Sequence, residues 1–234
     1  MKIQDSVVFI TGANRGLGLS FARAALAAGA RKVYAAARDP KSVTLEGVTP
    51  VALDVTQPEQ VAAAARACGD VTLLVNNAGI SRGATFLGSP DAFEAARAEF
   101  ETNFFGTWAM SRAFAPVLAV HGGGAIVNVL SALSWLSLPT AATYSASKSA
   151  TWSLSNGLRN ELRGLGTLVT SLHVAFMDTD MTRGITGDKA SPDAVAKLTL
   201  AAVEAGQVEV LADATTRHVK QGLVAEPPAY TQAR

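Results

Sequence analysis

The sequence has little of several features that would assign it to a class of protein at once. Cys68 is the only cysteine among 234 residues, so no internal disulfide can form, and a reducing cytoplasmic setting is expected. Its helical spacing with Val61, Ala64 and Ala65 predicts that the thiol packs in a core. No apolar run reaches the length of about 18 residues that a membrane helix needs, and the run before Thr11 is too short for a secretory signal.

Charged residues are also scarce, at 17% of the chain, and the net charge is only +1. We therefore expect neither a nucleic-acid partner nor a membrane-surface partner. His121, His173 and His218 are scattered, with no H-E-x-x-H or C-x-x-C pattern near them, so no metal site is expected. The G-x-S-x-G turn of hydrolases and the Walker A loop are absent as well.

Hydrophobic residues are abundant, at 49%, and fall into short runs of two alternating kinds. Runs rich in Val, Ile and Leu predict strands at 7–11, 32–37, 49–53, 72–76, 125–130, 167–173 and 208–211. Helical spacing predicts helices at 16–28, 58–68, 90–119, 142–164, 191–205 and 215–222. The alternation predicts an α/β fold with a mostly parallel, doubly wound, seven-stranded sheet and helices on both faces.

The first predicted strand leads into a glycine-rich turn, Thr11-Gly-Ala-Asn-Arg-Gly-Leu-Gly18. Glycines let the backbone turn sharply and approach phosphate oxygens, and the helix that follows supplies free N–H donors. A turn that is glycine-rich by chance is the weaker interpretation in this strand–turn–helix context. No linker or repeat divides the chain, so residues 1–234 are predicted to form one dinucleotide-binding and catalytic domain. A surface tail, mobile or docked on a neighbour, is expected from about residue 223.

Tyr144 and Lys148 lie one helical turn apart in the run Tyr144-Ser-Ala-Ser-Lys148. A cation beside a tyrosine favours the phenolate, so Lys148 is expected to lower the pKa of Tyr144 toward neutrality. Taken alone, the pair could equally be a solvated helix face. It gains meaning from Ser131, which stands 13 residues before Tyr144 at the end of a predicted strand.

The glycine turn and the Tyr144–Lys148 pair together resemble the short-chain dehydrogenase/reductase family, whose fold is of Rossmann type. The resemblance covers roughly residues 5 to 215. One departure is Val174-Ala175, where the family usually has Pro-Gly. The family's other marks follow in chain order: Asp54-Val55, Asn76-Asn-Ala-Gly79, Asn103, Ser131, and Thr179 in Asp178-Thr-Asp-Met181.

The resemblance implies transfer of a hydride between a nicotinamide ring and a carbonyl or alcohol carbon. Tyr144 would exchange the proton, Ser131 would hold the reacting oxygen, and Lys148 would contact the nicotinamide ribose. Asn103 would hold a water in a proton relay to Lys148; the alternative is a helix-interior Asn satisfied by backbone. Ser134 and Ser137 are alternative hydroxyl donors. The implied coenzyme contacts are Gly12, Asn14, Arg15, Gly16, Leu17, Gly18, Arg38, Asp54, Val55, Asn77, Ala78, Gly79, Tyr144, Lys148 and Thr179.

The end of the second strand favours NADP(H) over NAD(H) as the cofactor. A carboxylate there would bind the ribose hydroxyls of NAD, but Ala36 and Ala37 leave that position empty. Arg38 follows at once and Arg15 lies in the glycine turn, and a guanidinium matches phosphate geometry. Asp39 is the counter-argument, since it could pair with Arg38 or turn inward and select NAD. A solvated loop charge is the alternative for Arg15.

The predicted partner is a small-molecule carbonyl or secondary alcohol, such as a hydrophobic ketone or aldehyde. Residues 182–190 could close over it as a lid. The segment 97–118 carries more aromatic side chains than packing against one face of the sheet requires. Together with the resemblance, this surplus implies a homodimer or homotetramer. Two other functions remain open: a non-catalytic NADP-binding regulator, and a related epimerase or dehydratase. The expected pocket wall, which could instead be ordinary core, comprises Leu133, Trp135, Leu136, Leu138, Phe176 and Met177.

Overall fold

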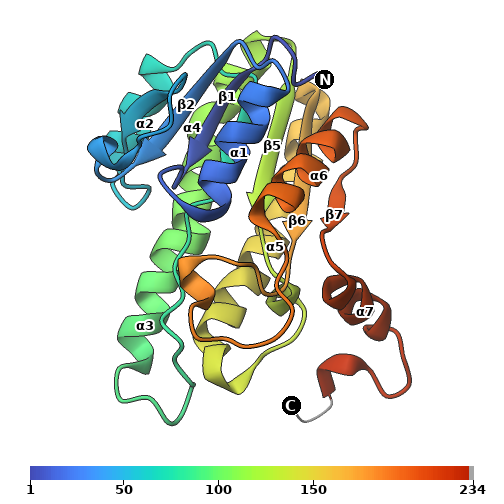
Figure 1. Ribbon diagram of the computed structural model, residues 1–234. Helices are drawn as coiled ribbons and strands as arrows, with labels where there is room; N and C mark the ends of the chain where they lie inside the picture. The colour runs from blue at the N-terminus through green and yellow to red at the C-terminus, as the bar shows by residue number, and fades with distance from the viewer. Residues whose placement is uncertain (232–234) are drawn as a thin grey trace.

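The computed structural model describes residues 1–231 and shows the predicted α/β fold of Rossmann type (Figure 1). Its strands all pair in parallel, in the order β3-β2-β1-β4-β5-β6-β7. The order reverses between β1 and β4, and ligands bind beside such a switch point. The strands are β1 (Val7–Thr11), β2 (Lys32–Ala37), β3 (Thr49–Ala52), β4 (Leu73–Asn76), β5 (Gly124–Val129), β6 (Thr167–His173) and β7 (Glu209–Leu211).

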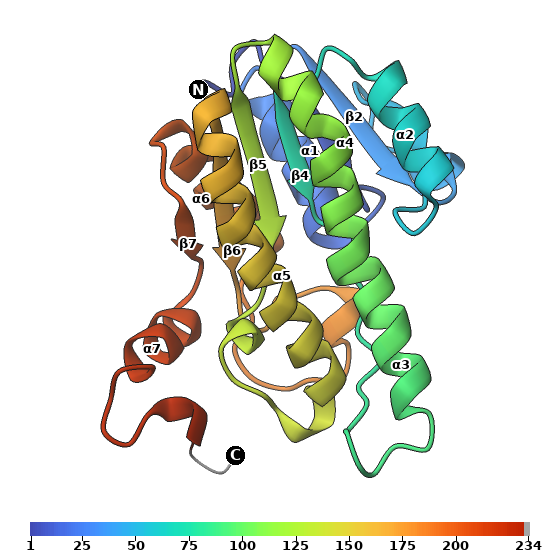
Figure 2. The ribbon, with the colours of Figure 1, turned by 180° about the vertical axis from the view of Figure 1, so that it is seen from behind.

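Helices cover both faces of the sheet. The pair α1 and α6 lies on one face (Figure 1), and α2, α4 and α5 lie on the other (Figure 2). Within residues 1–231, no helix combines the length and the apolar character that a membrane crossing demands. The helices are α1 (Gly16–Ala27), α2 (Pro58–Ala67), α3 (Ala92–Glu99), α4 (Thr107–Val120), α5 (Ala142–Leu162), α6 (Pro192–Glu204) and α7 (Ala214–Gly222).

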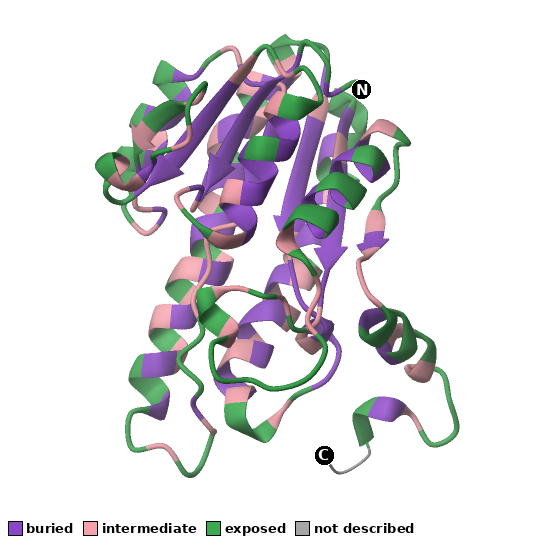
Figure 3. Cartoon of the chain, viewed as in Figure 1, coloured by how far each residue is buried: buried purple, intermediate pink, exposed green. Residues whose placement is uncertain are grey.

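The strands are buried on both sides, as Figure 3 shows. Successive side chains of a strand point to opposite faces, so β1 contributes to two separate cores. Val8 and Ile10 pack with the α1 and α6 side chains, whereas Val7 and Phe9 pack with those of α2, α4 and α5. This two-sided burial explains why the parallel strands appear in the sequence as continuous apolar runs.

The predicted bounds agree with the structure to within one or two residues, except for the helix expected at 90–119. That segment is α3, then a π-helical stretch at Phe100–Gly106, then α4. Within the stretch, Gly106 packs so closely that an added Cβ would lie 2.7 Å from Val55 Cγ2. The predicted helix is therefore confirmed from Ala92 to Val120, and what the sequence analysis missed is its π-helical insertion, a feature frequent at functional sites.

The predicted tail turns back toward α7 where the structure describes it, from Leu223 to Thr231. Ala229–Thr231 form a 3₁₀ turn, and Ala229 is buried. A Cβ on Gly222 would lie 2.7 Å from the Ala229 Cβ, so the tail packs back onto the end of α7. Residues 232–234 lie outside the described residues.

Gly18 and Gly157 offer a matched test of the packing at the glycine turn. A Cβ on Gly18 would lie 2.1 Å from the Gly12 carbonyl oxygen, so Gly18→Ala should lower the free energy of unfolding by about 1–3 kcal/mol. A Cβ on Gly157, within α5, would meet nothing within 4 Å, so Gly157→Ala should raise it by about 1 kcal/mol. Urea unfolding of the two variants measures both effects, and a neutral Gly18→Ala would contradict this packing.

Candidate active site

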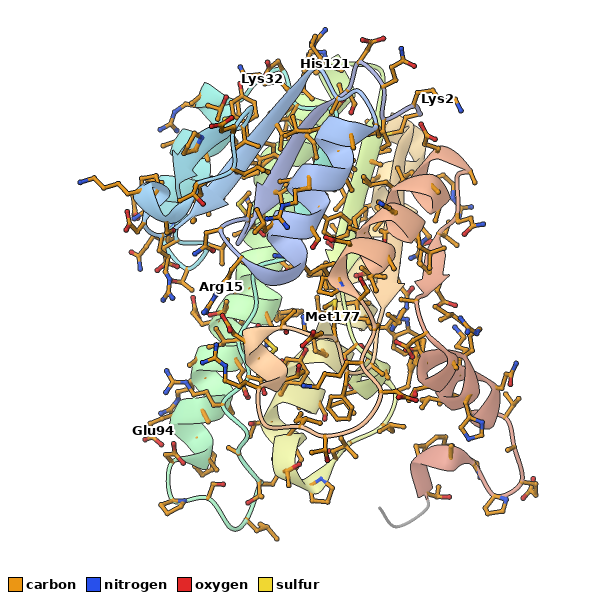
Figure 4. All side chains as sticks on the ribbon, viewed as in Figure 1. Lys2, Arg15, Lys32, Glu94, His121 and Met177 are labelled. Carbon is orange, nitrogen blue, oxygen red and sulfur yellow. The ribbon has the colours of Figure 1, made fainter. Side chains whose placement is uncertain are left out.

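The candidate site lies at the sheet edge where the carboxyl ends of the strands meet. Arg15, in the turn after β1, and Met177, in the segment after β6, both lie on this side (Figure 4). Such edges bind ligands in open parallel sheets because loops from several strands converge there. The site is therefore assembled from segments that are distant in the sequence.

The turn after β1 is fastened to the turn after β4. The Thr11 hydroxyl oxygen accepts hydrogen bonds from the backbone N–H groups of Asn77 and Ala78, each at 2.9 Å. The Asn77 side-chain amide donates to the carbonyl oxygens of Thr11 at 2.9 Å and Gly12 at 3.1 Å. The side-chain amide of Asn77 and the N–H groups of Asn77 and Ala78 therefore fix the path of the glycine turn. This contact explains why the run Asn76-Asn-Ala-Gly79 follows β4.

The glycine turn itself leaves N–H groups for a ligand. Gly12 and Gly16 have φ angles of +65° and +54°, a region that favours glycine. Arg15 precedes the first turn of α1 and makes no side-chain capping bond to it, so the N–H groups at this helix start are not capped. Leu17 is 5% exposed and packs in the core, which leaves its main chain as its contribution to the site.

A hollow of about 420 Å³ lies against this turn, lined by Gly16, Thr179 and other residues of 178–189. Thr179 lies close to Gly16, since an added Cβ there would be 3.4 Å from Thr179 Cγ2. Arg15 donates to the Asp180 carboxylate at 3.2 Å, and Arg183 donates to the same carboxylate at 2.5 Å. The exposed ion pairs thus join the glycine turn to the segment after β6.

The two acidic residues near the ends of β2 and β3 are engaged by their own turns. Asp39 accepts a hydrogen bond from the Lys41 N–H at 3.0 Å and caps a short 3₁₀ turn. Asp54 accepts from the Thr56 N–H at 3.0 Å and from its hydroxyl at 2.8 Å. Arg38 is exposed at the end of β2. Asp39 is therefore committed to its own backbone rather than to a bond with Arg38.

Tyr144 and Lys148 lie in α5 and face the end of β5. The Lys148 ammonium lies 5.6 Å from the centre of the Tyr144 ring and donates to the Val129 carbonyl oxygen at 2.7 Å. Ser131 follows β5, and its hydroxyl oxygen accepts from the Leu133 N–H at 3.1 Å. The Ser131 side chain lies near enough to the Tyr144 phenol to lower its pKa. The three predicted residues therefore lie together.

The alternative serines are placed differently. The Ser134 hydroxyl accepts a hydrogen bond from the Ser131 N–H at 3.3 Å, which completes a capping box around the 3₁₀ turn after Ser131. Ser137 is exposed. Ser131 is thus the serine whose side chain meets Tyr144.

The pKa values at this site are governed by removal from water. Desolvation raises the pKa of the Tyr144 phenol; the Ser131 hydrogen bond opposes this rise, and the negative charge of Glu99 adds to it. Desolvation also lowers the pKa of Lys148 to about 8. The expectation that the pKa of the phenol is lowered toward neutrality was wrong, because desolvation by burial raises it.

Asn103 lies in the π-helical stretch, and its side-chain amide is fully engaged. Its oxygen accepts from the Ile80 N–H at 2.9 Å, and its nitrogen donates to the Ile80 carbonyl at 3.0 Å and to the Ser147 hydroxyl at 2.9 Å. A Cβ on Gly79 would lie 3.2 Å from this amide oxygen and 3.6 Å from the Lys148 nitrogen. The Asn103 amide is thus satisfied mainly by the main chain of Ile80, which was the alternative interpretation of this residue. It nevertheless lies beside Lys148.

The structure adds His173, which the sequence analysis left without a role. This fully buried residue stacks on Trp135 with ring centres 3.9 Å apart, and its Nδ1 lies 3.1 Å from the Ser131 carbonyl oxygen. Trp135 and Leu136 pack with Val219 of α7 in a separate core cluster. Those two residues are therefore ordinary core rather than pocket wall, and they support Ser131 from behind.

A family model described as short chain dehydrogenase matches residues 6–190. The chain belongs to the short-chain dehydrogenase/reductase family. Among curated relatives of this family, Dehydrogenase/reductase SDR family member 7B of Bos taurus is 35% identical over 207 residues. The match covers 80% of this chain and 62% of the bovine protein, so this short-chain dehydrogenase/reductase spans less than two thirds of that relative's length.

Solved structures of the family resemble the chain over nearly its whole length. A short chain dehydrogenase from Burkholderia cenocepacia J2315, solved with NADP, is 43% identical with a TM-score of 0.94, covering 98% of this chain and 97% of that one. A short chain dehydrogenase/reductase from Burkholderia phymatum, solved with NAD, is 26% identical with a TM-score of 0.86, covering 100% and 99%. Both structures thus contain a nicotinamide coenzyme, with the 2′-phosphate in the first and without it in the second.

The buried His173 predicts a loss of stability in acid. Desolvation lowers the pKa of His173 to about 4, from an ordinary value of 6.5. Between these values the unfolded chain binds the proton and the folded chain does not, so stability falls as the pH drops from about 7 to about 4. The contribution is about 3 kcal/mol.

Denaturant unfolding at several pH values measures this contribution. The His173→Asn variant should show a flatter dependence of the unfolding free energy on pH than the parent. His121→Asn, which changes an exposed histidine, should keep the parent's slope. Equal slopes in all three proteins would show that His173 does not titrate as described.

Proposed function

We propose that the chain is an NADP(H)-dependent oxidoreductase that transfers a hydride between nicotinamide and a carbonyl or secondary alcohol carbon. The observation that carries this proposal is the meeting of Ser131, Tyr144 and Lys148 beside an uncapped glycine turn. A proton donor and a cation beside a phosphate-binding turn are the parts that such a reaction requires. Membership of the family supports the same reaction class.

The residues present fit a dinucleotide. Gly12 and Gly18 let the turn pack closely on itself and on Asn77 and Ala78, and the N–H groups at the start of α1 suit a pyrophosphate. Thr179 borders the adjoining hollow. The residues proposed to hold the coenzyme are Gly12, Asn14, Arg15, Gly16, Leu17, Gly18, Arg38, Asp54, Val55, Asn77, Ala78, Gly79, Tyr144, Lys148 and Thr179.

The engagement of Asp39 supports a preference for NADP(H). Its carboxylate caps its own turn, which leaves the exposed Arg38 as the charged group available at the end of β2. A guanidinium suits the 2′-phosphate in charge and in geometry. The NADP complex of the 43% identical protein from Burkholderia cenocepacia agrees with this preference.

When bound, the coenzyme supplies or accepts the hydride. Tyr144 gives its proton to the carbonyl oxygen in reduction and takes it from the alcohol in oxidation. Its raised pKa keeps the phenol protonated, which suits reduction. Ser131 donates a hydrogen bond to the same oxygen, an interaction worth about 3 kcal/mol of barrier. Lys148 contacts the ribose of the coenzyme, and Asn103 holds the loop that follows Gly79.

The proposed substrate is a hydrophobic ketone, aldehyde or secondary alcohol. Leu133 and Leu138 are partly buried at the edge of the Trp135 cluster, Leu133 bonds to Ser131, and Phe176 is 40% exposed after β6. With Met177 these residues offer an apolar surface once Trp135 and Leu136 are assigned to the core. The segment 182–190, pinned at its base by the Asp178 and Ala190 backbone bonds, is the proposed lid.

We further propose a single domain that forms a homodimer or homotetramer in the cytoplasm. The exposed aromatic side chains of Phe105 and Trp108, 45% and 44% exposed, support self-association along the α4 face. Large apolar groups gathered on one surface mark interaction sites.

Replacement of Tyr144 tests the assignment of the proton donor. Tyr144→Phe should lower kcat at least about 100-fold, because general acid catalysis is lost. Binding of NADPH, measured by fluorescence titration, should change little. Tyr230→Phe, at an exposed tyrosine, serves as the control and should keep parental activity. A fully active Tyr144→Phe protein would remove the acid–base role.

Replacement of Arg38 tests the cofactor preference. The parent should have the lower Michaelis constant for NADPH, and Arg38→Asp should invert the preference for NADPH over NADH by about tenfold or more, since the phosphate loses its partner. Arg31→Asp, at an exposed arginine before β2, should leave the preference unchanged. Equal Michaelis constants for both coenzymes in the parent would count against Arg38 as the selecting residue.

A further inference from the structure

The Ser131 hydroxyl is held by a short turn that begins at Ser131 itself. This 3₁₀ turn, Ala132–Ser134, is closed by the Ser134 N–H, which donates to the Ser131 carbonyl oxygen at 3.0 Å. The Leu133 N–H donates to the Ser131 hydroxyl oxygen at 3.1 Å. The direction in which this hydroxyl points is therefore set by the orientation of the turn beyond the end of β5.

A second donor to the same carbonyl oxygen comes from outside the turn. His173 is the last residue of β6, which pairs with β5, and it is fully buried. Its Nδ1 lies 3.1 Å from the Ser131 carbonyl oxygen. A carbonyl oxygen can only accept, so Nδ1 carries the ring proton and donates it to this bond. The neighbouring strand thus fixes the start of the turn through a side chain.

His173 also contacts the end of the turn. Its ring stacks on the Trp135 ring, with the ring centres 3.9 Å apart and the planes inclined by 19°. Trp135 also meets the Lys220 ammonium, 4.8 Å from its ring centre, and the edge of Trp152, with ring centres 6.2 Å apart. The imidazole therefore contacts both ends of the turn, Ser131 by a hydrogen bond and Trp135 by its ring face.

The other ring nitrogen gains nothing from this position. His173 Nε2 is buried and has no hydrogen-bond partner within residues 1–231. Glu209 Oε1 lies 3.9 Å from it, beyond hydrogen-bond distance, and both Glu209 oxygens accept from Lys220 at 2.8 Å. An unsatisfied buried nitrogen destabilises a fold, so an apolar ring would pack here at lower cost. What distinguishes histidine from such a ring is its bond to Ser131.

We propose that His173 is a positioning residue for the reaction: its Nδ1–H, bonded to the Ser131 carbonyl oxygen, orients the turn so that the Ser131 hydroxyl reaches the reacting oxygen. This inference rests on the proposed function, in which Ser131 donates a hydrogen bond to that oxygen. Such a donor aids catalysis only where it is held in place, so a small displacement of the turn costs rate. Among the described residues, the bonds and ring contacts of His173 reach neither Tyr144 nor Lys148, so it acts through Ser131.

Two substitutions separate the hydrogen bond from the packing. His173→Phe keeps a stacking ring and removes the donor, whereas His173→Asn loses the ring and keeps an amide N–H attached to Cγ, as Nδ1 is. In reduction of a ketone by NADPH, His173→Phe should lower kcat about tenfold, with the KM for NADPH within about twofold of the parent. His173→Asn should restore kcat to within about threefold of the parent.

The stability of the two variants should follow the opposite order. His173→Asn leaves a cavity beside Trp135, whereas His173→Phe fills the site, so urea should unfold His173→Asn first. A purely structural role would make the less stable variant the less active one. His218→Phe, at an exposed histidine of α7, is the matched control and should keep the parental kcat and stability.

A double-mutant cycle tests whether His173 acts through Ser131. In a Ser131→Ala background the hydroxyl is gone, so adding His173→Phe should lower kcat no further. A second tenfold loss in that background would show that His173 acts elsewhere, and would overturn the inference.

A further measurement does not depend on activity. The chain has three histidines, so ¹⁵N NMR of their ring nitrogens, with His173→Asn for assignment, identifies the His173 signals. At neutral pH we expect a protonated Nδ1 and an unprotonated Nε2. The reverse tautomer would overturn the inference, since Nδ1 could not then donate to the Ser131 carbonyl oxygen.

Failure of the inference and failure of the proposed function give different results. If Tyr144→Phe is inactive while His173→Phe keeps the parental kcat, or while His173→Asn is no more active than His173→Phe, the proposed function stands and the inference is overturned. If Tyr144→Phe is fully active, the proposed function is wrong and the inference is overturned with it.

Discussion

The burial of Lys148 and the partial burial of Tyr144 are the constraint on which the rest of the site depends. In a dry environment the phenol keeps its proton and the ammonium becomes easier to deprotonate, with a pKa of about 8. Every neighbouring polar group then acts more strongly than it would in water. The neighbouring polar groups are the Ser131 side chain, which favours the ionised phenol, and the Val129 carbonyl oxygen, which accepts a hydrogen bond from Lys148.

This dry environment is built by contacts that lie well behind the reacting groups. His173 meets the Ser131 carbonyl and stacks on Trp135, whose other neighbours include the Lys220 ammonium, 4.8 Å from its ring centre. Lys220 in turn binds both oxygens of Glu209 in β7 at 2.8 Å. The C-terminal part of the chain thus supports the strand end that carries Ser131, although it contributes no group to the reaction.

Periodicity sufficed for the fold class and the strand bounds, whereas the candidate site residues came from the resemblance to the family. The π-helical stretch could not be predicted from spacing, because the contacts that accompany it, with Val55 and Ile80, come from distant parts of the chain. The capping role of Asp39 depended equally on local geometry.

The most direct test of the central claim is a crystal structure with NADP⁺ and an unreactive analogue of an apolar ketone. We expect the Tyr144 hydroxyl to lie about 3 Å from the analogue's oxygen, with the Ser131 hydroxyl on the same atom. A phenol turned away from that oxygen, with another side chain or only solvent in its place, would contradict the account.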